Sequence, residues 1–354
     1  MWPTTACDGA STPDKSMTAT WTPPSPLFTD QPDDPELETV VNAIRAIDPS
    51  GDRFGETLRQ TFDQLYDGQH TGRYAWEQLR KTEKTHMGTL VEIALHRAFD
   101  FGDGDAMDYR IAGIEVDCKF SQRMGGWEIP PEAYAPTVGP PHLCLVVTAS
   151  DIKGEWIAGV VRVDPSGLRR RADGSLGTNR DNKVRLAADY SKRVRWLWGM
   201  PERPCRLPEN ILLHLSDPDR ARVLTATNSV GRSTGQSRIN ALFEVVQRRV
   251  INRGTILTVA QQDDGMKRAR DARLPRHLGH KGILVLGHQE NDPLIARDLA
   301  LEVPRKGSMI SVRVVPAADG HPGPAAEING QAWRVAQPHD PVVDAPQVHR
   351  GRDA

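Results

Sequence analysis

The stretch Asp105-Ala-Met-Asp108-Tyr-Arg-Ile-Ala-Gly113-Ile-Glu-Val-Asp117-Cys-Lys119 decides how the chain is expected to fold. Ala112-Gly113 is a plausible two-residue turn between two extended runs, so the stretch predicts a β-hairpin. In the second run apolar and polar residues alternate, and successive side chains of a strand point to opposite faces. Asp117 and Lys119 are therefore expected on one face, and the turn returns Asp108 beside them.

Two carboxylates with a lysine one residue beyond the second are suited to metal-assisted phosphodiester hydrolysis. Asp108 and Asp117 could hold a hard divalent cation, and Lys119 could orient or activate the attacking water or offset charge at the phosphate. Glu92 adds a third acid, because it lies at the edge of the apolar stripe of a helix predicted over 87–99. An ordinary hairpin with an exposed polar face has the same pattern, so the residues alone leave both readings open.

These residues and their surroundings resemble the PD-(D/E)xK nucleases. Glu92, Asp108 and Asp117-Cys118-Lys119 match the active-site pattern of that family, with Met107 where a proline is usual. Other segments resemble type II restriction endonucleases of the IIE kind, and this resemblance covers nearly the whole chain after about residue 34. These segments are Tyr66-Asp-Gly-Gln, Glu77-Gln-Leu, Lys84-Thr-His, Gly88-Thr-Leu-Val-Glu92, Val116-Asp-Cys-Lys-Phe120, Gly125-Gly-Trp127 and Val259-Ala-Gln-Gln-Asp-Asp264.

The resemblance implies a Mg²⁺-dependent, sequence-specific DNA endonuclease with Glu92, Asp108, Asp117 and Lys119 as catalytic residues. One or two Mg²⁺ ions would be held by Asp108 and Asp117, assisted by Glu92 and the backbone carbonyl of Cys118. The resemblance also implies a homodimer, since a palindrome is cut on both strands by two copies of one site. It further implies a GC-rich palindrome such as GCCGGC, and a second DNA site in the C-terminal half that stimulates cleavage. The alternative is a non-catalytic DNA-binding regulator on a nuclease-like scaffold.

The apolar runs predict the rest of an α/β fold. Residues 143–148 and 156–163 are continuous apolar runs, typical of the buried strands of a mixed sheet. With the hairpin and the helix before it, they predict a restriction-endonuclease-like sandwich, that is, a mixed sheet with flanking helices. Residues 183–198 are predicted to form a helix. The expected organisation is a disordered extension over 1–34, an endonuclease domain over 35–198, a linker over 199–208, a second domain over 209–339 and a flexible tail over 340–354.

Short helices followed by strands predict that the second domain is a winged helix-turn-helix-like DNA-binding unit. A short strand is expected over 211–215, and residues 255–262 are compatible with either a helix or a strand. One helix is predicted with its apolar face over 239–250 and is closed by arginines, which complement the helix dipole. A later basic helix is capped by Asp263 and Asp264. The candidate DNA-binding residues on these elements are Arg248, Arg249, Arg253, Lys267, Arg268, Arg270 and Arg273.

Charge is distributed unevenly along the chain. The net charge is −1, yet residues 161–313 contain 29 Lys and Arg against 16 Asp and Glu, a net of +13, which leaves −14 on the remainder. Such asymmetry predicts a cationic module that faces a polyanion, here double-stranded DNA. A solvated basic surface without a partner is the other reading.

Several classes of protein are disfavoured by the sequence. No apolar run reaches the ~18 residues of a membrane span, and no secretory signal opens the chain. Its four cysteines are scattered without a CxxC pair, which argues against a disulfide framework or a structural zinc site and favours a reducing cytoplasm. No phosphate-binding loop or dinucleotide fingerprint is present, so no nucleotide cofactor is expected.

Overall fold

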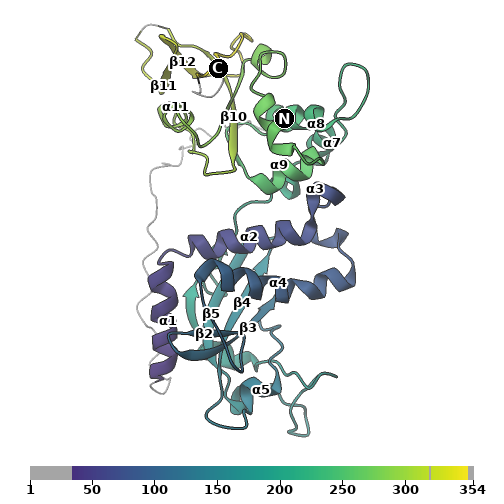
Figure 1. Cartoon of the computed structure of the whole chain (residues 1–354), viewed down its shortest axis with the longest axis vertical. Coiled ribbons are helices and arrows are strands. Elements are labelled where there is room, and N and C mark those ends of the chain that lie inside the picture. Colours follow the sequence, from purple (N-terminus) through teal and green to yellow (C-terminus); the bar gives the residue numbers. More distant parts are fainter. Residues whose placement is uncertain (1–33, 319, 350–354) are drawn as a thin grey trace, which may run out of the picture.

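The computed structural model describes residues 34–318 and 320–349, which form the two units stacked along the long axis in Figure 1. The first unit contains a seven-stranded sheet and the second a five-stranded sheet. The predicted N-terminal extension lies outside the described residues except for Asp34, which caps the first helix by accepting a hydrogen bond from Leu37 N. Within the described ranges no helix is long and apolar enough to cross a membrane.

The first unit combines long helices with the strands of the mixed sheet. Its helices are α1 (Pro35–Ile47), α2 (Asp52–Tyr66), α3 (Gly68–Thr71), η1 (Trp76–Gln78), α4 (Lys81–Phe99), α5 (Pro131–Tyr134), η2 (Pro165–Gly167) and η3 (Ala188–Arg193). Its strands are β1 (Gly102–Asp103), β2 (Tyr109–Ile111), β3 (Ile114–Ser121), β4 (Leu143–Ser150), β5 (Glu155–Arg162), β6 (Arg195–Trp198) and β7 (Cys205–Arg206).

The sheet runs in the order β1-β2-β3-β4-β5-β6, with β7 also paired to β5. The β3–β4 pair is parallel and the other pairs are antiparallel, so the predicted mixed sheet is confirmed. The predicted hairpin is present as β2 and β3. Ala112 and Gly113 both have positive φ, 50° and 84°, as a tight two-residue hairpin turn requires.

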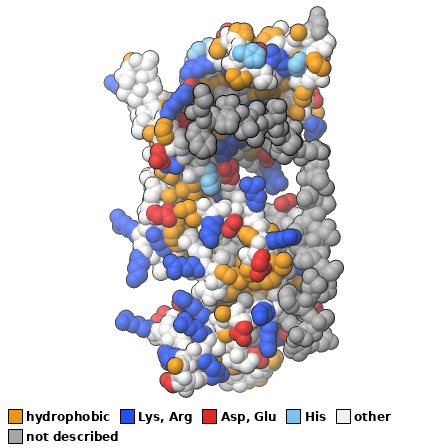
Figure 2. All heavy atoms as spheres, turned by 180° about the vertical axis from the view of Figure 1, so that it is seen from behind, with side chains coloured by type: hydrophobic (Ala, Val, Ile, Leu, Met, Phe, Trp, Pro, Cys, Tyr) orange, Lys and Arg blue, Asp and Glu red, His pale blue; other side chains and the backbone are white. Residues whose placement is uncertain are grey.

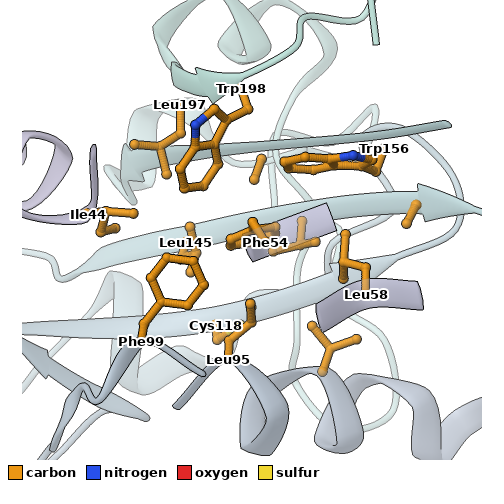
Figure 3. Packing of buried hydrophobic residues seen from close by; sticks show 14 of the residues in the cluster. Ile44, Phe54, Leu58, Leu95, Phe99, Cys118, Leu145, Trp156, Leu197 and Trp198 are labelled. Atoms are coloured by element: carbon orange, nitrogen blue, oxygen red, sulfur yellow. The ribbon is translucent and has the colours of Figure 1, made fainter. Parts of the chain in front are cut away.

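One face of the sheet is covered by α2 and α4 (Figure 1). A cluster of aromatic and aliphatic side chains, shown in Figure 3, packs between these helices and the sheet. Phe54 of α2 stacks on Trp156 with ring centroids 5.1 Å apart and lies 5.0 Å from Trp198. Cys118 of β3 points into the same cluster, so the even-numbered residues of β3 form the floor of this core. Packing of these residues in the core determines which side chains of β3 face the helices.

The odd-numbered residues of β3 consequently face the other side of the sheet. Asp117 lies opposite Cys144 and Lys119 opposite Val146 in the β3–β4 register, and both partners belong to a second apolar cluster. That cluster contains Trp127, Ile129 and Tyr134 among others. The predicted placement of Asp117 and Lys119 on one face is confirmed.

The second unit is a set of short helices packed against antiparallel strands. Its helices are α6 (Ile211–His214), α7 (Asp217–Leu224), α8 (Gly235–Val245), α9 (Arg253–Ala260), α10 (Gly265–Asp271), η4 (Gly279–Lys281) and α11 (Asp292–Asp298). Its strands are β8 (Val250–Ile251), β9 (Ile283–Leu286), β10 (Met309–Pro316), β11 (Ala325–Ile328) and β12 (Gln331–Val335), in the order β11-β12-β10-β8 with β9 paired to β10. Helices followed by strands match the predicted order; the winged-helix assignment stays a prediction.

Three predictions of local structure in and beside the first unit need correction. The helix predicted over 183–198 is wrong, because residues 195–198 form β6, whose Trp198 lies opposite Ala158 of β5. The segment predicted as a linker contains β7, and Leu207 beside it is buried in the first core. The segment predicted as a flexible tail packs onto the second unit as far as it is described, where Ala345 and Val348 are buried.

Two predictions in the second unit also need correction. Residues 211–214 form helix α6 instead of a strand. The helix predicted to end in a group of arginines stops at Val245, and the chain then turns into β8 before Arg253 begins α9. The ambiguous segment is helical, since α9 extends to Ala260.

Candidate active site

Four polar groups meet where β2 and β3 lie side by side. The Nζ atom of Lys119 is 2.6 Å from Asp117 Oδ1, 2.8 Å from the backbone oxygen of Cys118 and 3.5 Å from Asp108 Oδ2. The structure therefore brings Asp108, Asp117 and Lys119 together, as the hairpin pattern predicts. The backbone oxygen of Cys118 completes the group.

The hairpin itself aims the Asp108 side chain. Asp108 is the residue just before β2, and Cys118 N donates a hydrogen bond of 2.7 Å to Asp108 Oδ2. Because Cys118 lies between Asp117 and Lys119 on β3, this bond ties the first carboxylate to the strand that carries the other two side chains. A change of register by one residue would turn Asp117 and Lys119 to the opposite face.

Burial and the neighbouring positive charge have opposite effects on the pKa of Asp117, which is 3% exposed. Burial raises the pKa of the Asp117 carboxyl to about 7, although the neighbouring Lys119 acts to lower it. Burial acts to lower the pKa of the Lys119 ammonium, but attraction to Asp117 and Asp108 outweighs it, so that pKa lies above its ordinary value. Lys119 is consequently a cation at neutral pH.

Glu92 lies on α4 at the margin of this group. Tyr109, next to Asp108, donates a hydrogen bond of 2.8 Å from its hydroxyl to the backbone oxygen of Glu92, which fixes α4 against the hairpin. Burial, and after it the charge of Asp108, raises the pKa of the half-buried Glu92 carboxyl. Among the described residues no three His, Cys, Asp or Glu side chains are close enough to hold a metal ion together. Glu92 is thus near the two aspartates without joining them in a cluster.

The oxygens around Lys119 Nζ are of the kind that bind a hard divalent cation. Two carboxylates and one backbone carbonyl are typical ligands of Mg²⁺, which usually takes few protein ligands and keeps several waters. In the present arrangement the Lys119 ammonium satisfies these three oxygens. A positively charged group already lies at their meeting point, so the donor set fits a cation.

The candidate DNA-binding residues fall into two groups in the second unit. Arg248 and Arg249 lie between α8 and β8, and Arg253 is the first residue of α9. Arg249 forms a 2.6 Å ion pair with Glu209. Lys267, Arg268 and Arg270 are on α10, and Arg273 follows that helix.

The basic side chains on and after α10 differ in the ion pairs that they form within the fold. Lys267 pairs with Asp271 at 2.8 Å, and Arg268 pairs with Asp264 and Asp271. Arg270 is exposed, whereas the half-buried Arg273 binds the fully buried Asp292 at 3.0 Å. Arg273 therefore has a role inside the fold.

A polar groove in the second unit was missed by the sequence reasoning. It has a volume of about 750 Å³ and lies between α7, α8 and the loop before η4. Its cationic lining residues are Arg222, Arg276 and Lys281, and His277 and His280 also line it. Glu244 holds Arg222 at 3.0 Å and Lys281 at 2.6 Å. These cations are scattered along the sequence, so only the excess of positive charge over 161–313 signalled them.

Two aspartates and a lysine gathered on the hairpin of a mixed sheet are suited to phosphodiester hydrolysis, and comparison with known proteins assigns the chain to the restriction endonucleases. The model of the restriction endonuclease NaeI family matches residues 38–344. The chain is 50% identical over 327 residues to the type II restriction enzyme NaeI of Lentzea aerocolonigenes, across 92% of this chain and 98% of that relative. The chain belongs to the NaeI family of type II restriction endonucleases, which confirms the resemblance found in the sequence.

Proposed function

We propose that this type II restriction endonuclease cuts both strands of a GC-rich palindrome by Mg²⁺-assisted hydrolysis at Asp108, Asp117 and Lys119. The observation that carries the proposal is the convergence of two carboxylate oxygens and the Cys118 carbonyl oxygen on one cation, the Lys119 ammonium. The 50% identity to the type II restriction enzyme NaeI supports site-specific cleavage of DNA. The resemblance described for the sequence implies a palindromic target such as GCCGGC. A target of this symmetry favours a homodimer with one site per strand.

Asp108, Asp117 and the Cys118 carbonyl would hold the Mg²⁺ ion, with Glu92 at the edge of the site. When bound, the ion supplies Lewis-acid stabilisation of charge on the phosphate oxygens. Lys119, a cation at neutral pH, would donate hydrogen bonds to the attacking water or to a phosphate oxygen. Because its Nζ atom lies beside the oxygens of Asp117, Cys118 and Asp108, Lys119 would be placed to orient that water and to offset charge at the phosphate.

The two units would divide the work between them. The endonuclease domain corresponds to residues 35–198 together with β7, and residues 209–339 would form a winged-helix-like domain that binds a second copy of the target. The cationic segment of the sequence and the basic groove in the second unit support this division. Figure 2 shows several groups of Lys and Arg side chains on one face of the molecule, interspersed with acidic and hydrophobic side chains, and such groups can contact DNA phosphates. The assembled aspartates and lysine favour an enzyme over a non-catalytic regulator.

The test is digestion of a plasmid of known sequence in Mg²⁺, followed by mapping of the fragment ends. We expect discrete fragments whose ends fall in one GC-rich palindrome. Asp117→Ala should abolish cleavage, and Lys119→Ala should reduce it by about 10²–10³-fold, the usual effect of removing one group that stabilises charge in the transition state. Both variants should bind DNA without metal, and Lys119→Ala should keep more of its metal affinity than Asp117→Ala.

Lys153→Ala is the matched control, since Lys153 is exposed in the turn between β4 and β5. That variant should cut at the rate of the natural protein. Near-natural cleavage by either Asp117→Ala or Lys119→Ala would show that the site assignment is wrong.

A further inference from the structure

The loop that leads into Asp108 is held by one side chain, the carboxylate of Glu115 on β3. Three consecutive backbone N–H groups, those of Asp105, Ala106 and Met107, donate to Glu115 oxygens at 3.0, 3.0 and 2.9 Å. Consecutive N–H groups that point to one place form a concave binding site for a negative charge. Here the negative charge belongs to the protein itself.

We propose that Glu115 is a positioning residue, which presets the backbone before Asp108 so that the Asp108 carboxylate is in place for a divalent cation. The proposal rests on the proposed function, in which Asp108 is a metal ligand. Glu115 itself touches neither metal nor DNA in this scheme. It acts through the loop.

Backbone pairing alone gives this loop little support. The loop joins β1 to β2, and the β1–β2 pair has two register positions while the β2–β3 pair has three. Glu115 lies opposite Arg110 in the latter pair, next to the loop it binds. The three amides before Asp108 obtain their acceptor from Glu115, so loss of this carboxylate would leave that backbone without its main anchor.

Strand β3 fixes both the backbone before Asp108 and the Asp108 side chain. Glu115 holds the backbone before Asp108, and Cys118 N holds the Asp108 side chain at 2.7 Å. Glu115 and Asp117 alternate along β3 with the residues that face the main core. One strand therefore supplies a proposed ligand, Asp117, and the supports that aim a second ligand, Asp108.

Close packing of the loop supports this reading. A Cβ atom added to Gly104 would lie 2.1 Å from the Met107 backbone oxygen and 3.0 Å from Glu115 Oε2. Real Cβ contacts are not this short, so glycine is required for the loop to close around the carboxylate. The loop and Glu115 fit each other as one unit.

Arg110 offers a matched control because it binds the same carboxylate without holding the loop amides. Its Nε and NH2 groups donate to Glu115 Oε1 at 3.2 and 2.7 Å, and it also pairs with Asp105. Arg110→Gln removes this charge and leaves the three amide hydrogen bonds to Glu115. Glu115→Gln keeps the size of the side chain but replaces one acceptor oxygen with a donor.

The experiment uses the full-length protein with two readouts. Hydrogen exchange without metal measures the amides of residues 104–109, and calorimetric titration with Mn²⁺ measures cation affinity without DNA. We expect Glu115→Gln to speed exchange in this segment and to weaken Mn²⁺ binding by about 10–100-fold, the usual effect of removing a group that orients a metal ligand. Arg110→Gln should stay within a few-fold of the natural protein in both readouts.

Glu115→Asp keeps the charge but shortens the reach, and it serves if the glutamine variant does not fold. Glu115→Asp should weaken Mn²⁺ binding less than Glu115→Gln does. Unchanged Mn²⁺ affinity in a folded Glu115 variant whose loop exchanges faster would overturn the positioning role, because Glu115 would then be only a structural support. Equal losses in Arg110→Gln would also overturn it. Absence of Mn²⁺ binding by the natural protein would instead count against the proposed metal site itself.

Discussion

Asp117 must be ionised to hold a cation, yet its surroundings favour the protonated acid. Burial raises the pKa of its carboxyl to about 7 from an ordinary value of 3.8. Between these two pH values the folded protein therefore binds more protons at this position than the unfolded chain does. The free energy of unfolding must then decrease as the pH rises through this window.

We expect the metal-free protein to lose stability between about pH 4 and pH 7 through Asp117. A difference of about 3 pKa units corresponds to about 4 kcal/mol as an upper limit. Urea unfolding at a series of pH values, compared with Asp117→Asn, isolates this contribution, because asparagine does not titrate. The curve for the natural protein should fall relative to that for Asp117→Asn as the pH rises. Parallel curves would show that the pKa of Asp117 is not raised.

Helix α10 is the element on which the DNA-binding prediction can be tested most directly. Each lost phosphate contact lowers the slope of log affinity against log salt concentration by about one unit. Changing Lys267, Arg268 and Arg270 together to Gln should therefore reduce the slope by up to about three, measured without metal. Since Lys267 and Arg268 also pair with acids on their own helix, part of the reduction reflects DNA competing with those acids.

The polar groove provides the comparison for α10. Changing Arg222, Arg276 and Lys281 to Gln alters a cationic surface of the same unit that borders α8 and η4. A slope that falls with the α10 variant alone would place DNA on α10. An unchanged slope in the α10 variant together with a reduced slope in the groove variant would move the DNA site to the groove.

Elements that depend on neighbouring residues could be predicted from the sequence. Elements that depend on pairing between distant segments were predicted wrongly. The β2–β3 hairpin was predictable because a two-residue turn and strict alternation lie within fifteen residues. Strand β6 was mistaken for part of a helix, because Leu197 and Trp198 also fit a helical stripe. Pairing with the distant strand β5 makes them part of the sheet, and Trp198 then packs against Phe54 of α2.

The same distinction holds in the site. Asp108, Asp117 and Lys119 were predictable because one hairpin carries all three. The role of Glu115 was not, since it depends on three loop amides turning toward one carboxylate. Glu92 was proposed from its place at the edge of a helical stripe, but its distance from the aspartates depends on how α4 packs against the hairpin in the folded chain.

At the scale of the whole molecule, the two units are joined by a buried polar contact. Asp151, at the end of β4, forms a 2.5 Å ion pair with Arg59 of α2 and accepts hydrogen bonds from Tyr66 at 2.7 Å and Asn210 at 3.0 Å. Asn210 immediately precedes α6, the first helix of the second unit, and also donates to the backbone oxygen of Tyr74. The two hydrogen bonds of Asn210 therefore attach the residue before α6 to the first unit.

Asn210 contacts both units, so it lies on a physical path between the two proposed DNA sites. If the second unit binds a copy of the target, its occupancy should favour the cleaving state of the first unit by about 1–3 kcal/mol, or about 5–150-fold. A long DNA with one target should then be cut slowly, and short duplexes that contain the target should accelerate its cleavage. The measurement is the initial rate on one-site and two-site plasmids at increasing duplex concentration.

The α10 variant with Lys267, Arg268 and Arg270 changed to Gln sharpens this test. It retains Asp108, Asp117 and Lys119, so slow cleavage of the one-site DNA should persist while stimulation by added duplex is lost. Linkage also requires the reverse effect, in which DNA on the first unit tightens duplex binding to the second. If the natural protein cuts one-site and two-site plasmids equally fast and ignores added duplex, the two-site model fails, while the assignment of the chain to the type II restriction endonucleases is unaffected.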